Sequence, residues 1–236
     1  MNSQFAGISS SLKLIALALT MAFSASAFAK DQLPETVDGL QLQKGTKLAV
    51  VYLQAGETLE DYDKIKIDDV YVAFKKNWQR DYNQSTVTLG EKVTDRDVEK
   101  IKEYLANEFK AVLTKELQDK SGYEVVDTTG KDVLFIQPAI INLVVTAPDV
   151  HSATRNRSRI SSAGQMTLYM ELYDSKSGDK IALVSDAQAV GERGGFGYRA
   201  TSGTNKMEFG RVLAKWAETM RNGLDEAKAA ASPSGD

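Results

Sequence analysis

The sequence contains no cysteine and one histidine, His151, and its longest largely apolar run is the ten-residue stretch 14–23. Without cysteine the chain can form no disulfide bond, and it lacks the lipidated cysteine of a lipoprotein. A zinc site of histidine and cysteine ligands would have one ligand, too few for tetrahedral coordination. Because a Ser-His-Asp triad would depend on His151 alone, which we interpret as a solvated loop residue, the sequence argues against histidine- and thiol-based catalysis.

Sequence motifs of nucleotide-binding and acyl-transfer enzymes are also missing. The chain has no G-x-S-x-G nucleophile elbow, no phosphate-binding G-x-x-x-x-G-K-[ST] segment and no EF-hand calcium loop. The sequence therefore predicts a protein that holds no metal or cofactor and is not an enzyme.

The first thirty residues have the pattern of a secretory signal. Lys13 is the only charged residue before Lys30, an apolar stretch follows it, and the small-residue pattern Ala27-Phe28-Ala29 ends the segment. The apolar stretch is too short to span a bilayer, which takes about 20 residues. We therefore expect cleavage after Ala29, export to a bacterial periplasm, and no transmembrane segment in the mature chain.

The charge and length of the mature protein limit its possible partners and its number of domains. Removing Lys13 with the leader lowers the 29 lysines and arginines to 28, against 32 aspartates and glutamates, which gives a net charge of −4. An acidic chain is a poor candidate for binding nucleic acid, which usually requires a basic face. We expect a single domain over residues 30–226, large enough for a core without disulfides, and a disordered polar tail at 227–236.

A long amphipathic helix is the clearest element. Thr94 to Asp97 resembles a capping box, and Gly122 is placed to end the helix. Between them apolar residues recur every three or four positions, at Val98, Ile101, Leu105, Phe109, Val112, Leu113 and Leu117. A second helix is expected to begin near Asn205 and to bury a similar stripe, made of Val212, Leu213, Trp216, Met220 and Leu224.

Strand patterns surround the first helix. They predict strands at 47–53, 65–74, 123–127 and 133–145, with a bulge at Asp68-Asp69, a break at Pro138 and a long loop over 75–92. Over 166–173 apolar residues alternate with Thr167, Tyr169, Glu171 and Tyr173. The turn 174–179 then leads into the segment 181–190, and together they predict a β-hairpin. This order predicts an α+β fold, a two-layer sandwich with a mainly antiparallel sheet and two amphipathic helices on one face.

Several strand and turn segments carry a family resemblance. They are Tyr52-Leu-Gln-Ala-Gly56, the segment 62–72, the segments 170–174 and 177–180, and Trp216 in the last helix. In these segments the sequence resembles the domain of unknown function 3313 family of bacterial envelope proteins. Members of that family are commonly lipoproteins, a pattern from which this chain departs because it has no cysteine. The resemblance implies a fold and an envelope location, and it implies no activity.

Two loops carry the residues best suited to binding. Arg155, Arg157 and Arg159 alternate in the loop 151–162, so an extended chain would place all three on one side, where their guanidinium groups could bind phosphate or carboxylate. No acidic residue lies between positions 150 and 170. The glycine-rich loop 191–203 adds two aromatic residues, Phe196 and Tyr198. The alternative is that both are ordinary solvated loops.

One other cluster contains side chains that could take part in catalysis or bind an ion. It consists of four carboxylates, Asp61, Asp63, Asp68 and Asp69. A pair of carboxyls could serve glycosidic chemistry, or the group could bind a divalent ion. Neighbours at 68 and 69 point to opposite faces of a regular strand, however, so they do not pair. We favour a solvated turn and strand edge.

These observations leave three classes of function. The leading interpretation is a non-enzymatic binding or scaffold module of the bacterial cell envelope, with an envelope protein, polymer or lipid as its partner. The alternative is a periplasmic carrier of an anionic small molecule or lipid, held by the three arginines. A carboxylate-based hydrolase is the third class, and it requires a cleft that a sequence does not reveal.

Overall fold

The computed structural model describes residues 33–86, 92–146, 148, 159–160, 162–191, 198–199 and 202–231. The chain divides into two compact units, Met1–Pro34 and Glu35–Asp236, and all described helices and strands belong to the second. The helices are α2 (Trp78–Ser85), α3 (Asp95–Ser121) and α4 (Ser202–Ala231). The strands are β1 (Thr36–Val37), β2 (Leu40–Leu42), β3 (Val50–Gln54), β4 (Lys64–Ile67), β5 (Tyr71–Phe74), β6 (Glu124–Val125), β7 (Val133–Val145), β8 (Arg159–Ile160), β9 (Gly164–Asp174), β10 (Lys180–Val190) and β11 (Tyr198–Arg199).

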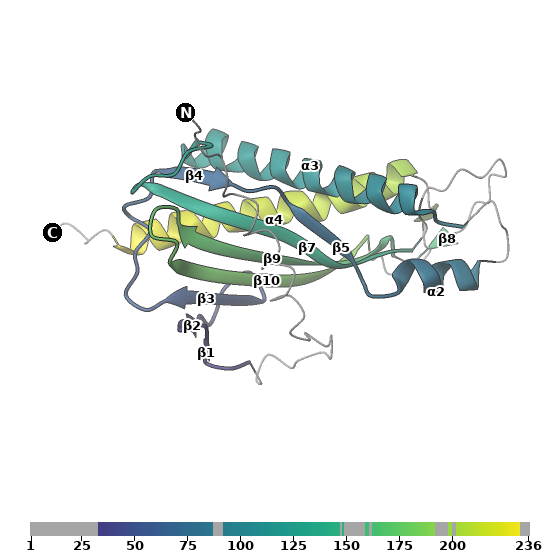
Figure 1. Ribbon diagram of the computed structural model, residues 1–236, viewed down its shortest axis with the longest axis horizontal. Helices are drawn as coiled ribbons and strands as arrows, with labels where there is room; N and C mark the ends of the chain where they lie inside the picture. Colours follow the sequence, from purple (N-terminus) through teal and green to yellow (C-terminus); the bar gives the residue numbers. More distant parts are fainter. Residues whose placement is uncertain are drawn as a thin grey trace, which may run out of the picture. The chain divides into compact units, whose positions relative to one another are not determined.

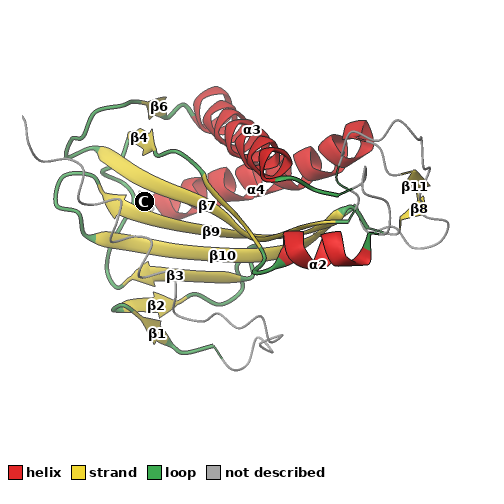
Figure 2. Cartoon of the chain, turned by 45° about the vertical axis from the view of Figure 1, so that its right-hand side comes forward, coloured by secondary structure: helices red, strands yellow, loops and turns green. Residues whose placement is uncertain are grey.

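Nine of the described strands form one sheet. Its order is β1-β2-β3-β10-β9-β7-β4-β6, and β5 also pairs with β7. The strands from β1 to β7 along this order pair antiparallel, whereas β4 and β5 run parallel to β7 and β6 runs parallel to β4. The expected α+β class is therefore confirmed, with a mixed sheet. Helices α3 and α4 lie along the same face of it (Figures 1 and 2).

Helix α3 forms as its sequence pattern predicts. The side chain of Thr94 accepts a hydrogen bond from the backbone N–H of Asp97, the Asp97 carboxylate accepts one from the backbone of Thr94, and Gly122 ends the helix in the left-handed conformation. Phe109, Leu113 and Leu117 are fully buried. No helix among the described residues is both long and apolar enough to cross a membrane.

Helix α4 packs on the sheet and against α3. Leu213, Trp216, Met220 and Leu224 are buried as expected, and the ring of Trp216 meets that of Phe109 edge to face at 6.3 Å. The helix begins at Ser202, earlier than Asn205, and continues to Ala231, past the expected start of the tail at 227. Residues 232–236 lie outside the described part of the chain.

The hairpin β9–β10 also follows its prediction, and alternation within β9 specifies which of its side chains face the helices. Met170 pairs with Val184 on the helix-facing side, and Glu171 pairs with Leu183 on the opposite side. The turn that joins them is held by Asp174, whose Oδ1 accepts the backbone N–H groups of Lys176 and Ser177.

The predicted break at Pro138 is wrong, because β7 runs through it for 13 residues. The carbonyl of Ile136 accepts the backbone N–H of Asp68, so it points toward β4. Two residues further on, the Pro138 nitrogen points the same way, into the gap between β4 and β5. No hydrogen-bond donor is needed there, so the proline does not interrupt the ladder.

The gap between β4 and β5 also shows that the predicted bulge at Asp68-Asp69 is wrong. The phase of the alternating pattern changes because β4 ends at Ile67 and β5 begins at Tyr71, and both strands pair with β7. The segment 65–74 is therefore two short strands, although its apolar residues Ile67 and Val70 are buried as the pattern indicates.

The loop predicted over 75–92 contains helix α2. Asn77 precedes the helix in the left-handed conformation, and the buried ring of Trp78 stacks on Phe74 with ring centres 4.2 Å apart. Asn83 then donates to the carbonyl of Val93 and accepts from its N–H, at 2.8 and 2.7 Å. Tertiary contacts therefore stabilise a polar helix that propensity alone does not predict.

A short hairpin, β1–β2, was also missed. Its turn, Asp38-Gly39, has positive φ at both residues, which is the conformation that Asp-Gly favours in two-residue hairpin loops. Leu40 follows the turn and is buried with Tyr52 and Leu183 in a small cluster on the sheet face opposite α3 and α4. The Asp-Gly pair between apolar residues is the signal that could have predicted this hairpin.

Candidate functional site

The two loops singled out in the sequence leave the sheet side by side. The backbone N–H of Thr146, after β7, donates to the carbonyl of Ala163, and the Ala163 N–H donates to the carbonyl of Val190 at the end of β10, both at 2.8 Å. The hydroxyl of Ser162 also bonds to the carbonyls of Gly164 and Val190. Both ends of the first loop and the start of the second are therefore held close together.

Gly164 is required at this junction. A Cβ at Gly164 would lie 1.9 Å from the carbonyl oxygen of Val144, a distance that no side chain tolerates. The close approach places β9 against the last residues of β7, immediately before the first loop leaves the sheet.

Beyond the sheet, a second ladder joins the two loops. Strands β8 and β11 pair antiparallel, with Tyr198 opposite Ile160 and Arg199 opposite Arg159. Two of the five predicted binding residues, Arg159 and Tyr198, thus lie on adjoining strands. Arg155, Arg157 and Phe196 lie outside the described residues, as does His151, so the three-arginine site stays a prediction.

A hollow of about 210 Å³ lies between α3 and α4 near the residues from which these loops leave. We call it the helix-end hollow. Its wall is mostly apolar and consists of Ile101, Tyr104 and Leu105 from α3, Val145 and Pro148 at the end of β7, and Phe209 from α4. Pro148 and α4 connect directly to the two loops, so the hollow belongs to the same end of the fold.

The rim of the helix-end hollow is polar. Asp97 and Lys100 contribute from α3, and Asn205 and Lys206 from α4. The Nζ of Lys206 lies 4.9 Å from the centre of the Tyr104 ring, a cation–π contact that holds the lysine over the rim. Burial raises the pKa of Tyr104, so its hydroxyl stays neutral and can serve as a hydrogen-bond donor or acceptor.

A second polar cluster, centred on Glu171, lies on the sheet face opposite α3 and α4. The Glu171 carboxylate accepts hydrogen bonds from the hydroxyls of Tyr169 and Tyr173 at 3.0 and 2.6 Å and from Lys180 at 2.7 Å. Lys180 also reaches Asp38 at 3.0 Å. The sequence pattern predicted the shared face of Tyr169, Glu171 and Tyr173, but it did not predict Lys180 or Asp38 as their partners.

The protonation of this cluster is fixed at neutral pH. Burial acts to raise the pKa of Glu171, but the hydrogen bonds from Lys180 and the two tyrosines outweigh it and lower the pKa. Burial and the adjacent carboxylate raise the pKa of both Tyr169 and Tyr173. A general acid or base works best with a pKa near the operating pH, so these shifts favour a structural role over a catalytic one.

These shifts predict that Glu171 stabilises the fold only while it is ionised. Because its pKa is lowered from 4.5, its contribution is present above that pH and is lost as the pH falls through the lower folded value. Glu171→Gln should lower the free energy of unfolding at neutral pH by about 1–2 kcal/mol and flatten its decline in acid. Urea unfolding at a series of acidic pH values measures both effects. The exposed Glu103→Gln is the control, and equal acid profiles for Glu171→Gln and the wild type would contradict the prediction.

Three of the four clustered aspartates, Asp63, Asp68 and Asp69, contact separate partners. Asp63 binds Lys228, and Asp69 binds Lys110 at 2.7 Å. Asp68 accepts a hydrogen bond from the side chain of Gln137. Within the described residues no group of three potential ligands could hold a metal ion. These contacts agree with the preferred interpretation of a solvated turn and strand edge.

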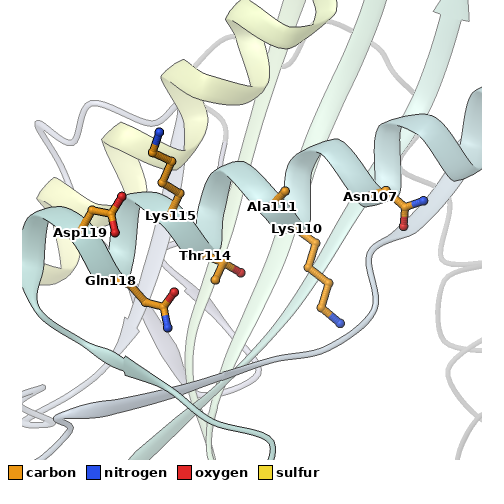
Figure 3. A pocket seen from close by; sticks show the side chains of 7 residues that line it. All are labelled: Asn107, Lys110, Ala111, Thr114, Lys115, Gln118 and Asp119. Carbon is orange, nitrogen blue, oxygen red and sulfur yellow. The ribbon is translucent and has the colours of Figure 1, made fainter.

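A further hollow lies on the outer side of α3 (Figure 3). Its seven residues, Asn107, Lys110, Ala111, Thr114, Lys115, Gln118 and Asp119, all come from this one helix. Because no second element contributes to its wall, this hollow is shallow and does not enclose a ligand. We therefore do not consider this hollow a functional site.

Comparison with solved structures gives weak similarity. The PelC dodecamer from Paraburkholderia phytofirmans has a chain that is 9% identical, with 72% of this chain and 96% of that chain covered and a TM-score of 0.36. A protein of the DUF330 family model from Xanthomonas campestris is 11% identical, with 69% and 87% covered and a TM-score of 0.34. Similarity at this level does not establish a shared topology. No curated protein matches the chain.

Family assignment rests on the sequence. The family model described as "Protein of unknown function (DUF3313)" matches residues 24–218, most of the chain. The match includes the strands β3, β9 and β10 and Trp216, in which the resemblance was first visible. This chain therefore belongs to the DUF3313 family.

Proposed function

We propose that this protein is an exported, non-enzymatic binding module of the bacterial cell envelope. Its leader directs it to the periplasm, where the mature chain from Lys30 binds an anionic envelope partner. In this proposal the fold is a two-layer sandwich of the sheet and helices α3 and α4. The binding surface is the end of the sandwich at which the loops 151–162 and 191–203 leave it.

The pairing of β8 with β11 carries this proposal. It joins the loop that bears the three arginines to the loop that bears Phe196 and Tyr198, so a partner that meets one loop also meets the other. Arginines with no acidic residue nearby in the sequence favour phosphate or carboxylate groups. Aromatic side chains beside them supply contact area at low conformational cost.

Replacing Arg155, Arg157 and Arg159 together by glutamine tests the proposal. We expect the thermal midpoint to stay nearly unchanged and the affinity for envelope partners captured from cells to fall by about tenfold, which corresponds to 1.4 kcal/mol. High salt should weaken partner binding by the wild-type protein in the same way, because exposed charges are screened beyond about 10 Å at 0.1 M salt. Quantitative affinity capture measures both effects.

A matched control removes three positive charges elsewhere. Lys115, Lys131 and Lys176 are exposed, and glutamine at these positions changes the net charge equally without touching the loops. The proposal predicts normal partner recovery for this variant. It is wrong if the two triple variants behave alike, and the arginines are structural if their loss lowers the thermal midpoint by many degrees.

A second candidate function is a carrier of an anionic small molecule. The helix-end hollow favours it, because two lysines, Lys100 and Lys206, lie on the rim of an apolar wall. Small-molecule sites commonly combine an apolar wall with a few polar groups that orient the ligand. Mass spectrometry of the native protein distinguishes the two functions: a co-purified anion supports the carrier, and cross-linked proteins support the binding module.

A further inference from the structure

A different hollow, of about 230 Å³, lies between the C-terminal half of α4 and the helix-facing side of the sheet. We call it the β3 hollow. Its floor is made by five apolar side chains, which are Val51 and Leu53 from β3, Leu172 from β9, and Ala182 and Val184 from β10. Met220 and Leu224 of α4 form the apolar roof, and both are nearly completely buried.

Gly223 lines the β3 hollow from α4 and is exposed. A Cβ at Gly223 would meet no atom within 4 Å, so no neighbouring side chain packs against this position. Glycine inside a helix is destabilising relative to alanine, and alanine would fit here. Packing therefore does not require this glycine, and a larger side chain here would occupy space at the edge of the hollow.

The mouth of the β3 hollow carries a net positive charge. Its charged lining residues are Lys44 and Lys47, from the connection between β2 and β3, and Glu226 from α4. The Nζ of Lys47 lies 3.0 Å from Oε1 of Glu226, and both side chains are exposed. An exposed ion pair of this kind contributes little to stability, so it can open without loss of the fold. Among the described residues, no ion pair involves Lys44.

We propose that the β3 hollow binds the aliphatic chain of a single-chain anionic amphiphile, whose carboxylate or phosphate lies on Lys44 and Lys47. The apolar floor and roof exclude a polar ligand, and the lysines select a negative head group. A volume of 230 Å³ is larger than an engineered apolar cavity of about 150 Å³ that binds benzene. It is below the roughly 300 Å³ at which sites for drug-sized ligands begin, so it fits one chain and not two.

Calorimetric titration of the purified protein with decanoate, below the micelle concentration, tests this proposal. We expect decanoate and decyl phosphate to bind, decyltrimethylammonium to bind much more weakly, and butyrate not to bind. Vesicles of a two-chain anionic phospholipid distinguish a membrane surface from the single-chain ligand. The proposal is overturned if the cationic amphiphile binds as tightly as decanoate, or if the vesicles bind and decanoate does not.

Gly223→Leu places an isobutyl group in the hollow, whereas Gly210→Leu makes the same change on the same helix outside it. A Cβ at Gly210 also meets no atom within 4 Å, so the two variants are matched. Gly223→Leu should lower the affinity for decanoate by at least about tenfold, equivalent to 1.4 kcal/mol, while Gly210→Leu leaves this affinity unchanged. The double variant Lys44→Gln with Lys47→Gln should lower the affinity for decanoate and leave the affinity for decanol unchanged. Equal affinities in all variants would exclude this site.

A measurement on the wild type does not depend on how these variants fold. A nitroxide-labelled fatty acid should broaden the methyl resonances of Met220, Leu224 and Val184 and leave that of Ile101, in the helix-end hollow, sharp. Broadening confined to Ile101 would overturn the assignment. Because the variant without Arg155, Arg157 and Arg159 should bind decanoate normally, this inference and the proposed function can fail independently.

Discussion

Phe109→Asp is expected to unfold most of the protein at room temperature. Phe109 is fully buried between α3 and the sheet, with its ring against that of Trp216. Loss of the ring costs about 3–5 kcal/mol, and an unpaired carboxylate in an apolar interior costs several more. The sum is comparable to the entire stability of a domain, about 5–15 kcal/mol. Far-ultraviolet circular dichroism and urea unfolding measure the loss.

Asn107→Asp is the matched control for Phe109→Asp. It introduces the same side chain two residues away, on the exposed side of α3, where the expected change in the free energy of unfolding is within about 0.5 kcal/mol. A cooperative unfolding transition in the Phe109→Asp variant at a urea concentration close to that of Asn107→Asp would mean that α3 packs through a different face.

Asp186→Ala is expected to destabilise the fold by about 1–3 kcal/mol, because it leaves the buried indole N–H of Trp216 without an acceptor. Asp186 is 6% exposed, and its carboxyl oxygens accept hydrogen bonds from the indole N–H of Trp216 at 2.7 Å and the backbone N–H of Ala49 at 3.1 Å. The side chain of Gln188 donates a third at 2.7 Å. One carboxyl group therefore connects α4, β10 and the residues before β3. Urea unfolding measures the change.

A double-mutant cycle with Trp216→Phe isolates the hydrogen bond to the indole. The double variant should be less destabilised than the sum of the single variants by about 0.5–3 kcal/mol, because the unsatisfied N–H that Asp186→Ala creates is absent from it. Gln188→Ala removes the half-buried donor and should have a small effect. Strict additivity of Asp186→Ala and Trp216→Phe would show that this hydrogen bond does not stabilise the fold.

Periodicity was enough to predict elements that bury one side by themselves. Helix α3 repeats apolar residues every three or four positions between a capping box and a glycine, and β9 alternates apolar and polar residues before a polar turn. In both cases, residues close in the sequence determine which side is buried, so neither prediction depended on the partner element. The same holds for Trp216, whose place in the stripe of α4 was correct.

Predictions failed where a distant segment decides the local conformation. Pro138 is tolerated because β4 ends and β5 begins beside it, which nothing near Pro138 in the sequence indicates. Helix α2 is short and polar, and it is stabilised by Phe74 stacking on Trp78 and by Asn83 bonding to Val93. A helix of this length is marginal without such contacts.

Local spacing and residue type were sufficient to predict the α+β class, the buried faces of α3, α4 and β9, and the family. By contrast, the pairing of β8 with β11, the contacts of Lys180 and Asp38 with the Glu171 cluster, and the two hollows beside α4 became visible only in the folded chain. Each of these depends on residues far apart in the chain meeting across the sheet. Such meetings are set by strand order and register, which local spacing does not encode.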